Sequence, residues 1–333
     1  MIIPKKVKES TIVIGLLAKD CAKAIEKNIP EVEKLGACFA DYHIIIYENN
    51  STDGTKELLT QWQSINEKVL AITEDLPETD AQQRKLHLGK NPTRIQRIAD
   101  CRNRVLEETR KRFAPDFFCF IDIDIEWFSS KSIVEAIEHA PDDWGALFAN
   151  GRVWLEYPDH VDKNPFPYDS YAFVKEGVNP ANTKGWVVDR DFHPMTAWVM
   201  NQGTKRHAYF GCHSAFGGIG IYRWELLKPL YYSIYQTPEL KAIGACMCEH
   251  IPVHIDIVRQ GYRLYIVRDM EVCYWRENPK VRRGLDSWKN HHHLIHYFVH
   301  QRRVLMRIIW QNIKDWFKKP DQLTSLSPAN NNV

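Results

Sequence analysis

The sequence lacks long apolar runs and has almost no net charge. No segment reaches the roughly 20 consecutive apolar residues that a membrane-spanning helix requires. The positive charges of residues 1–6 are not followed by the apolar stretch of a secretory signal. The formal net charge is +2 over 333 residues, so no global field favours a nucleic acid as partner. We therefore expect a cytoplasmic protein that does not bind nucleic acid.

Complete signatures of zinc and phosphate-loop sites are also missing. Cys246 and Cys248 stand just before His250, but no second Cys-x-x-Cys pair completes a structural zinc site. The eight cysteines are mostly embedded in apolar or helical patterns, which favours free thiols over disulfides. The glycines at 217–220 lack the dinucleotide-binding spacing and the Lys-Ser/Thr of a phosphate loop. We expect instead a turn in which the backbone closely approaches a ligand.

Strand-like and helix-like segments alternate along the first third of the chain. With 44% hydrophobic residues, the chain can bury a sizeable core. The predicted strands cover 10–17, 44–47, 69–73 and 118–124, and the predicted helices cover 18–33, 54–64 and 93–112. This order predicts an α/β fold with a mostly parallel central sheet and helices on both of its faces.

Two carboxylates end the most apolar of these strands. Asp122 and Asp124 follow the run from Phe118, and in a strand they point to the same face. Such a pair can bind a hard divalent cation or a ribose hydroxyl. Two solvated carboxylates at a strand end are the simpler alternative, because Asp-x-Asp alone is a common sequence.

A second strand ends in a polar loop. The apolar run up to Tyr47 is followed by Glu48, Asn50 and Asp53, residue types that favour turns and helix N-caps. Asp53 is explained as well by a helix cap as by ligand binding, whereas a cap does not require Glu48. Ligands bind at the carboxyl ends of strands in open α/β sheets, and both polar segments are predicted there.

Together these segments resemble the nucleotide-binding half of the GT-A glycosyltransferases. The resemblance rests on residues 47–55 followed by 120–124. With the helix 97–104, the segment 216–222 and the tripeptide 248–250, the chain is more narrowly similar to the capsule-type mannosyltransferases. The similarity extends over roughly residues 10 to 280.

This resemblance implies a Rossmann-like nucleotide half joined to an acceptor half. It implies transfer of a sugar from a nucleotide-sugar donor, a UDP- or GDP-sugar, to a hydroxyl of a glycan, glycolipid or glycoprotein, with Mn²⁺ or Mg²⁺ as cofactor. Asp124 is the implied metal ligand, and Asp122 would hold the ribose or, through water, the metal. His250 is a further candidate metal ligand by its position, and Asp124 and Glu249 are the expected catalytic residues. The implied donor-binding residues are Leu17, Ala18, Lys19, Glu48, Asn50, Asp53, Arg97, Arg102, Asp122 and Gly218.

Alternatives remain for the chemistry on the acceptor side. Glu249 is the expected base in an inverting reaction and would position the acceptor in a retaining one. His250, His254 and Asp256 compete with it. A sugar-phosphate nucleotidyltransferase and a noncatalytic carbohydrate-binding protein are the other classes, although residues 16–20 lack the glycine-rich loop of the former.

Four regions are expected along the chain. Residues 1–150 would form the nucleotide-sugar half and 151–290 the acceptor half. Aromatic and basic residues interleave in 291–320, a predicted helix that either packs on the core or contacts a membrane surface peripherally. Residues 321–333 have the composition of a disordered tail.

Overall fold

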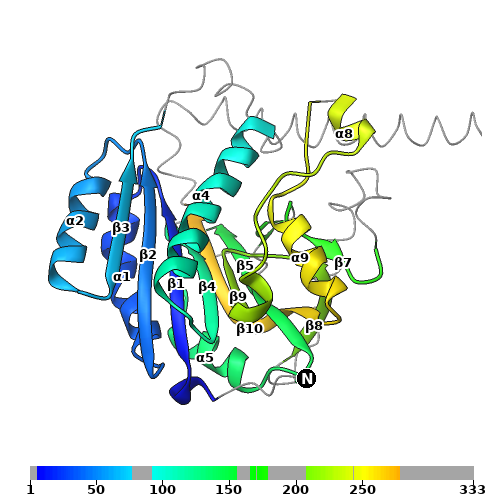
Figure 1. The fold of residues 1–333 in the computed structure, drawn as a ribbon, viewed down its shortest axis with the longest axis horizontal. Helices are drawn as coiled ribbons and strands as arrows, with labels where there is room; N and C mark the ends of the chain where they lie inside the picture. Colours follow the sequence, from blue (N-terminus) through cyan, green and yellow to red (C-terminus); the bar gives the residue numbers. More distant parts are fainter. Residues whose placement is uncertain are drawn as a thin grey trace, which may run out of the picture. The chain divides into compact units, whose positions relative to one another are not determined.

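The computed structural model describes residues 6–76, 92–155, 166–169, 171–178, 208–242 and 244–277 (Figure 1). The strands are β1 (Thr11–Ala18), β2 (Asp41–Asn49), β3 (Val69–Glu74), β4 (Phe117–Asp122), β5 (Trp144–Leu155), β6 (Phe166–Pro167), β7 (Val174–Lys175), β8 (Tyr209–Ser214), β9 (Ile219–Arg223) and β10 (Arg263–Glu277). The helices are the 3₁₀ turn η1 (Val7–Glu9), α1 (Ala22–Gly36), α2 (Thr55–Ile65), α4 (Pro92–Arg112), α5 (Ser130–Glu138), α7 (Trp224–Leu227), α8 (Pro238–Ala242) and α9 (His250–Arg259).

The described strands form one large sheet in the order β3-β2-β1-β4-β9-β5-β10-β8-β7, with β6 paired to β5. The pairs among β3, β2, β1 and β4 are parallel, and Figure 1 shows these four strands side by side. Beyond β4 the sheet is mixed, because β9 is antiparallel to both β4 and β5. The predicted α/β fold with a large central sheet is confirmed, and the predicted parallel pairing covers β3-β2-β1-β4 and the β5–β10 pair.

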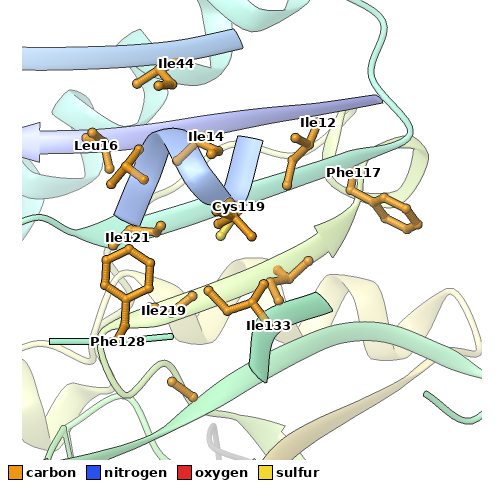
Figure 2. Packing of buried hydrophobic residues seen from close by; sticks show 14 of the residues in the cluster. Ile12, Ile14, Leu16, Ile44, Phe117, Cys119, Ile121, Phe128, Ile133 and Ile219 are labelled. Carbon is orange, nitrogen blue, oxygen red and sulfur yellow. The ribbon is translucent and has the colours of Figure 1, made fainter. Parts of the chain in front are cut away.

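Helices cover both faces of the sheet, as predicted. One apolar layer joins α1, α2 and α5 to the sheet, and Figure 2 shows Ile14 of β1, Ile121 of β4 and Ile133 of α5 within it. A second layer joins α4, α7 and α9 to the opposite face, where Phe118 and Phe120 of β4 are buried. Alternation of side chains along β4 accounts for this division.

The carboxyl ends of three strands meet at one edge of the sheet. Leu17 near the end of β1 is in register with Tyr47 of β2 on one side and with Asp122 of β4 on the other. Ala18 is in register with Glu48. The two polar segments that the sequence places after strands are therefore neighbours in the fold.

The chain divides into two compact units. Residues 1–156 and 161–277 form one, and 157–160 with 278–333 form the other, which lies outside the described residues. The predicted helix at 291–320, its membrane contact, the tail at 321–333 and the domain boundary at 150 stay predictions. Among the described helices, none is long and apolar enough to span a membrane.

Candidate functional site

The loops after β1 and β2 are fastened to each other by polar side chains. Asp53 Oδ2 accepts the amide hydrogen of Ala22 at 3.0 Å, and its Oδ1 accepts that of Thr55 at 3.1 Å. Asp53 therefore receives hydrogen bonds from the first residues of both α1 and α2, in line with the capping alternative. Ser51 Oγ accepts from the amide of Asp20 at 3.0 Å. These contacts hold the carboxyl ends of two strands at a fixed separation.

Asn50 also has a structural contact. It lies in the left-handed backbone region with a φ of 57°, which asparagine tolerates better than most residues. Its side-chain amide donates to the carbonyl of Leu76 at 2.8 Å, and its Oδ1 accepts from the amide of the same residue at 3.2 Å. Both polar atoms of the Asn50 side chain thus anchor the chain after β3, and donor binding by Asn50 stays a prediction.

Glu48 is fully buried at the end of β2. Its Oε1 accepts from the amide of Ser51 at 2.7 Å, whereas no donor among the described residues reaches Oε2. A buried carboxylate oxygen without a partner is costly, so a ligand that donates a hydrogen bond there would be favoured. On the neighbouring strand Leu17 is partly buried, Ala18 is buried and Lys19 is exposed.

β4 ends at Asp122, and Asp124 lies in the turn that follows, so the strand predicted to carry both aspartates stops before Asp124. The side-chain amide of Asn28 on α1 donates to the carbonyls of Ile123 and Ile125 at 2.9 and 2.7 Å, which fixes the backbone between and beyond the aspartates. The amide of Asp122 donates to the carbonyl of Gly218 at 2.9 Å. Gly218 has a φ of 93°, a conformation that favours glycine. The predicted glycine turn therefore abuts the acidic strand end through its backbone.

Arg102 of α4 is buried between two carboxylates. Its Nη2 lies 3.6 Å from Asp122 Oδ1, and its Nε donates to Glu249 Oε1 at 3.2 Å. Burial raises the pKa of Asp122 to about 8, although the guanidinium of Arg102 acts in the opposite direction. Arg97 on the same helix is half-buried, and its phosphate contact stays a prediction.

Glu249 precedes α9 and is itself buried, with 5% of its side chain exposed. Its second oxygen, Oε2, accepts from the thiol of Cys248 at 3.3 Å. His250 Nε2 lies 3.6 Å from Glu249 Oε1, and burial lowers the pKa of His250 well below its usual range, so its ring is neutral. The His250 ring stacks on Phe216 at 4.2 Å between centroids. Its role as a metal ligand stays a prediction.

A neutral histidine network lies behind this carboxylate. His254 Nδ1 is 2.8 Å from Ser214 Oγ, and Nε2 is 2.9 Å from Tyr222 Oη. Burial lowers the pKa of His254 to about 3. Because Ser214 and Tyr222 occupy both ring nitrogens of His254, this residue is disfavoured as the base. Asp256, the other competitor, has 45% of its side chain exposed and forms an ion pair with Arg259 one turn along α9.

Sequence reasoning missed Tyr168, Asp169 and Tyr274. Asp169 adopts a φ of 70° and accepts a hydrogen bond from the Gly217 amide, while burial and the nearby Glu249 raise its pKa to about 6. Tyr274 donates from Oη to Asp124 Oδ2 at 3.2 Å, and its ring stacks on Tyr168 at 3.6 Å. No local motif marks these three residues, since long-range pairing of β5, β6 and β10 brings them to the site.

A divalent cation fits the donor set at this edge. Carboxylate oxygens such as those of Asp122 and Asp124 are the ligands that Mg²⁺ and Mn²⁺ prefer. A cation beside Asp122 would also offset the burial that raises its pKa. In the described part of the chain, no group of three or more His, Cys, Asp or Glu side chains is arranged to share an ion. Phosphate oxygens and water would complete the coordination, as is usual for Mg²⁺.

Comparisons with known proteins give similar solved structures at low identity. No family model and no curated protein matches the chain. Among the similar structures are the Pyrobaculum calidifontis mannosyltransferase PcManGT in complex with GDP-Man and Mn²⁺ (14% identity, TM-score 0.41), S. aureus TarS 1-349 in complex with UDP-GlcNAc (14%, 0.42) and GalNAc-T7 with UDP, GalNAc and Mn²⁺ (9%, 0.41). The three alignments cover 90%, 80% and 81% of this chain. They cover 66%, 58% and 44% of the respective similar proteins. This chain therefore spans about two thirds of the first protein and less of the others. At these TM-scores the likeness assigns no residue, and membership of the capsule-type mannosyltransferases stays a prediction.

Proposed function

We propose that the protein is a metal-dependent glycosyltransferase that takes a sugar from a nucleoside diphosphate donor. The observation that carries this proposal is the pairing of Asp122 and Glu249 with the single guanidinium of Arg102, next to the aligned ends of β1, β2 and β4, with Asp169 near enough for Glu249 to raise its pKa. If all three carboxylates were ionised, their charge would exceed that of one arginine, and the pKa values of Asp122 and Asp169 are raised accordingly. A bound divalent cation would restore the balance, and a diphosphate is its natural companion in such sites.

On the donor side, Asp124 and Asp122 would hold the cation. The metal would neutralise the negative charge that develops on the departing diphosphate. The orphan Oε2 of Glu48 would accept a hydrogen bond from the ribose or the base, while Leu17 and Ala18 would line the nucleoside. A UDP- or GDP-sugar satisfies these requirements equally.

On the acceptor side, a carboxylate would receive the proton of the acceptor hydroxyl. In an inverting reaction, a bond forms between that oxygen and the anomeric carbon while the bond from this carbon to the diphosphate breaks. Glu249 is our first assignment for the base. Asp169 competes because it is half-buried rather than fully buried and has no close ion pair among the described residues, whereas Glu249 is held by Arg102.

Two other classes make different predictions. A sugar-phosphate nucleotidyltransferase would consume a nucleoside triphosphate and release pyrophosphate. A noncatalytic binding protein would bind a donor or glycan without turnover. Release of a nucleoside diphosphate that depends on Mn²⁺ and on an acceptor distinguishes our proposal from both, and acceptors of the glycan, glycolipid and glycoprotein types belong in that assay.

The first experiment is a thermal-stability screen with nucleotides and sugar nucleotides in the presence of Mn²⁺, Mg²⁺ or chelator. A ligand that binds only the folded state raises the apparent stability. We expect one nucleoside diphosphate family to stabilise the protein, and only with metal. Asp124→Asn should abolish this stabilisation. Asp256→Asn, at a half-buried aspartate that pairs with Arg259, should serve as the matched control that preserves it.

The same screen separates the donor side from the acceptor side. Glu249→Gln should preserve donor binding and lower turnover by about 10²- to 10⁴-fold, the usual contribution of a general base. If Asp169→Asn lowers turnover by this amount and Glu249→Gln does not, Asp169 is the base. Normal turnover by the Asp124 variant and by both acceptor-side variants would contradict the assignment of this site.

A further inference from the structure

The side chain of Arg102 is almost completely buried. Only 6% of it is exposed, its Nε donates to Glu249, and its Nη2 lies 3.6 Å from Asp122. Aromatic rings flank the guanidinium, with its central carbon 4.8 Å from the ring of Phe216, 5.0 Å from that of Phe120 and 5.7 Å from that of Tyr232. The fork therefore has two carboxylate partners and an aromatic enclosure before any substrate binds.

Its surroundings differ from those of another arginine on the same helix. Arg104, two residues along α4, has 43% of its side chain exposed and pairs with Glu74 at 2.5 Å near the surface. An arginine that grips a diphosphate needs a free fork edge, because its advantage over lysine is two parallel hydrogen bonds to one group. The Nε and Nη2 groups of Arg102 already face carboxylates, and only 6% of the side chain is exposed, so a two-bond contact with phosphate is poorly served by this geometry.

We propose that Arg102 is a positioning residue, which does not contact the donor but holds the carboxylates of Asp122 and Glu249 in one fixed geometry. Asp122 ends β4 and Glu249 precedes α9, and 147 residues separate Arg102 from Glu249 in the chain. Arg102 thus cross-links the donor side of the site to the acceptor side. This inference rests on the proposed function and adds a role that couples its two halves.

The physical reason is the cost of burying like charges together. Without Arg102, the two carboxylates would repel each other in a site from which water is largely excluded, and each would move or become protonated. A displacement of about 1 Å of a catalytic group can cost about 10²-fold in rate. Residues that orient the groups contacting metal or substrate typically contribute about 10- to 100-fold to affinity or activity.

Lysine should replace Arg102 poorly even though it keeps the charge. Its ammonium is a point charge without the planar fork, so it cannot span both carboxylates and stack against the rings in the same way. Arg102→Lys therefore separates the charge of the residue from its geometry. Arg104→Met is the matched control, since it removes an arginine and an ion pair from the same helix without touching the site carboxylates.

The first part of the test concerns unfolding and does not depend on activity. We would measure urea unfolding of Asp122→Asn, Glu249→Gln and their combination, with either Arg102 or Arg102→Met in the background. With Arg102 present, the unfolding equilibrium constant of the double variant should differ by roughly 2- to 100-fold from the value that the two single variants predict together. Such coupling is typical of residues that share a partner. In the Arg102→Met background, this coupling should disappear or change sign. The same coupling in both backgrounds would overturn the proposed cross-link.

The second part measures binding and turnover. Calorimetry with UDP and GDP, each with Mn²⁺, identifies the nucleotide that binds. A titration with Mn²⁺ alone should show that Arg102→Lys binds the ion about 10- to 100-fold more weakly, because Asp122 is displaced, and the turnover number should fall by a similar factor. Free guanidinium at a concentration that does not unfold the protein should partly restore turnover to Arg102→Ala, and not to Arg102→Lys, whose side chain fills the site.

The outcomes separate this inference from the proposed function. If the unchanged protein binds neither nucleotide with Mn²⁺, the proposed function fails, and the unfolding measurements still decide the cross-link. If it binds one of them, and Arg102→Lys keeps its affinity for Mn²⁺ alone but loses affinity for the nucleotide in proportion to turnover, Arg102 is a donor ligand and the positioning role is wrong. If Arg104→Met loses turnover as severely as Arg102→Lys, the effect belongs to α4 in general, and the inference is overturned as well.

Discussion

The two halves of the central sheet are organised by different rules. From β3 to β4 every neighbouring pair is parallel, and the helices α1 and α2 link β1, β2 and β3 in sequence. From β9 to β7 antiparallel pairs predominate, and β5 lies between β9 and β10, two strands that come much later in the chain. The donor side of the candidate site belongs to the first half, and most of its acceptor side belongs to the second.

The difference lies in what holds the site residues in place. In the half from β3 to β4, which we call the parallel half, the polar site residues directly follow their strands, and short-range loop contacts such as those of Asp53 fix their positions. In the half from β9 to β7, which we call the mixed half, the positions of the site residues depend on close backbone contacts between distant segments. A Cβ atom on Gly217 would lie 2.3 Å from the carbonyl oxygen of Ala149. The same kind of substitution should therefore change the free energy of unfolding by different amounts in the two halves.

The largest effect should come from Gly217→Ala. The new Cβ would clash with backbone, and the φ of 64° disfavours any residue other than glycine. We expect a loss of about 3 kcal/mol or more in the free energy of unfolding. Gly54→Ala in the parallel half is the control, because its φ of 91° is similarly unfavourable but no atom lies within 4 Å of the added Cβ.

For Gly54→Ala we expect a loss of roughly 1 kcal/mol, the cost of the backbone conformation alone. Urea unfolding of the two variants measures the difference directly. Equal losses would mean that strain in the backbone, rather than close packing of the glycine turn against β5, determines the stability at both positions. The contrast between the halves would then not hold at this point.

The next effect concerns pH. His254 in the mixed half has a pKa lowered to about 3, against about 6.5 in an unfolded chain, so the folded state binds fewer protons between these values. The free energy of unfolding contributed by this group is complete above pH ~6.5 and is lost as the pH falls toward ~3, by about 1.4 kcal/mol per pH unit. His254→Gln should remove this contribution.

The comparison of variant with unchanged protein isolates the histidine. Asp122 and Asp169 have raised pKa values, about 8 and about 6, and they act in the opposite direction because the folded state binds their protons more tightly. Those carboxylates are present in both proteins. Urea unfolding at several pH values between ~5 and ~7 should therefore show that the free energy of unfolding rises less with pH, or falls more, in His254→Gln than in the unchanged protein. Identical slopes would show that burial and the nearby charge of Arg102 do not hold the His254 ring neutral.

The parallel half of the sheet could be predicted from the sequence more fully than the mixed half. The strands 10–17, 44–47 and 69–73 were predicted because parallel strands alternate with helices, and this periodicity is local. The placement of Asp122 and Glu48 at one sheet edge follows from the rule for carboxyl ends. In the mixed half, Asp169 and Tyr274 reach the site through pairings between strands far apart in the chain, which no local pattern encodes.

The sequence also could not distinguish ligand contacts from scaffold contacts. Asn50 and Asp53 were predicted to bind the donor, yet their side chains bond to backbone groups of neighbouring segments. Asn, Asp and Ser serve turns and caps through the same hydrogen bonds that would recognise a ribose. For Arg102, the resemblance implied a contact with the donor, whereas its burial between Asp122 and Glu249 depends on tertiary packing.

The smallest predicted effect tests where the two halves touch. Tyr274 of β10 donates to Asp124, the exposed carboxylate that follows β4, so one hydroxyl from the mixed half orients a proposed metal ligand of the parallel half. Tyr274→Phe keeps the ring stacked on Tyr168 and removes one hydrogen bond. We expect Mn²⁺ to bind about 2- to 10-fold more weakly, the worth of a single such bond, with little change in stability.

Electron paramagnetic resonance of free Mn²⁺ in a titration measures this affinity without any assay of turnover. Tyr265→Phe is the control, since Tyr265 lies on the same strand and donates to a carboxylate, that of Asp143, at 2.8 Å outside the site. Unchanged or tighter Mn²⁺ binding by Tyr274→Phe would mean that this hydroxyl competes with the cation for Asp124 or plays no part in its binding. A weakening confined to Tyr274→Phe would show that the mixed half orients the metal ligand supplied by the parallel half.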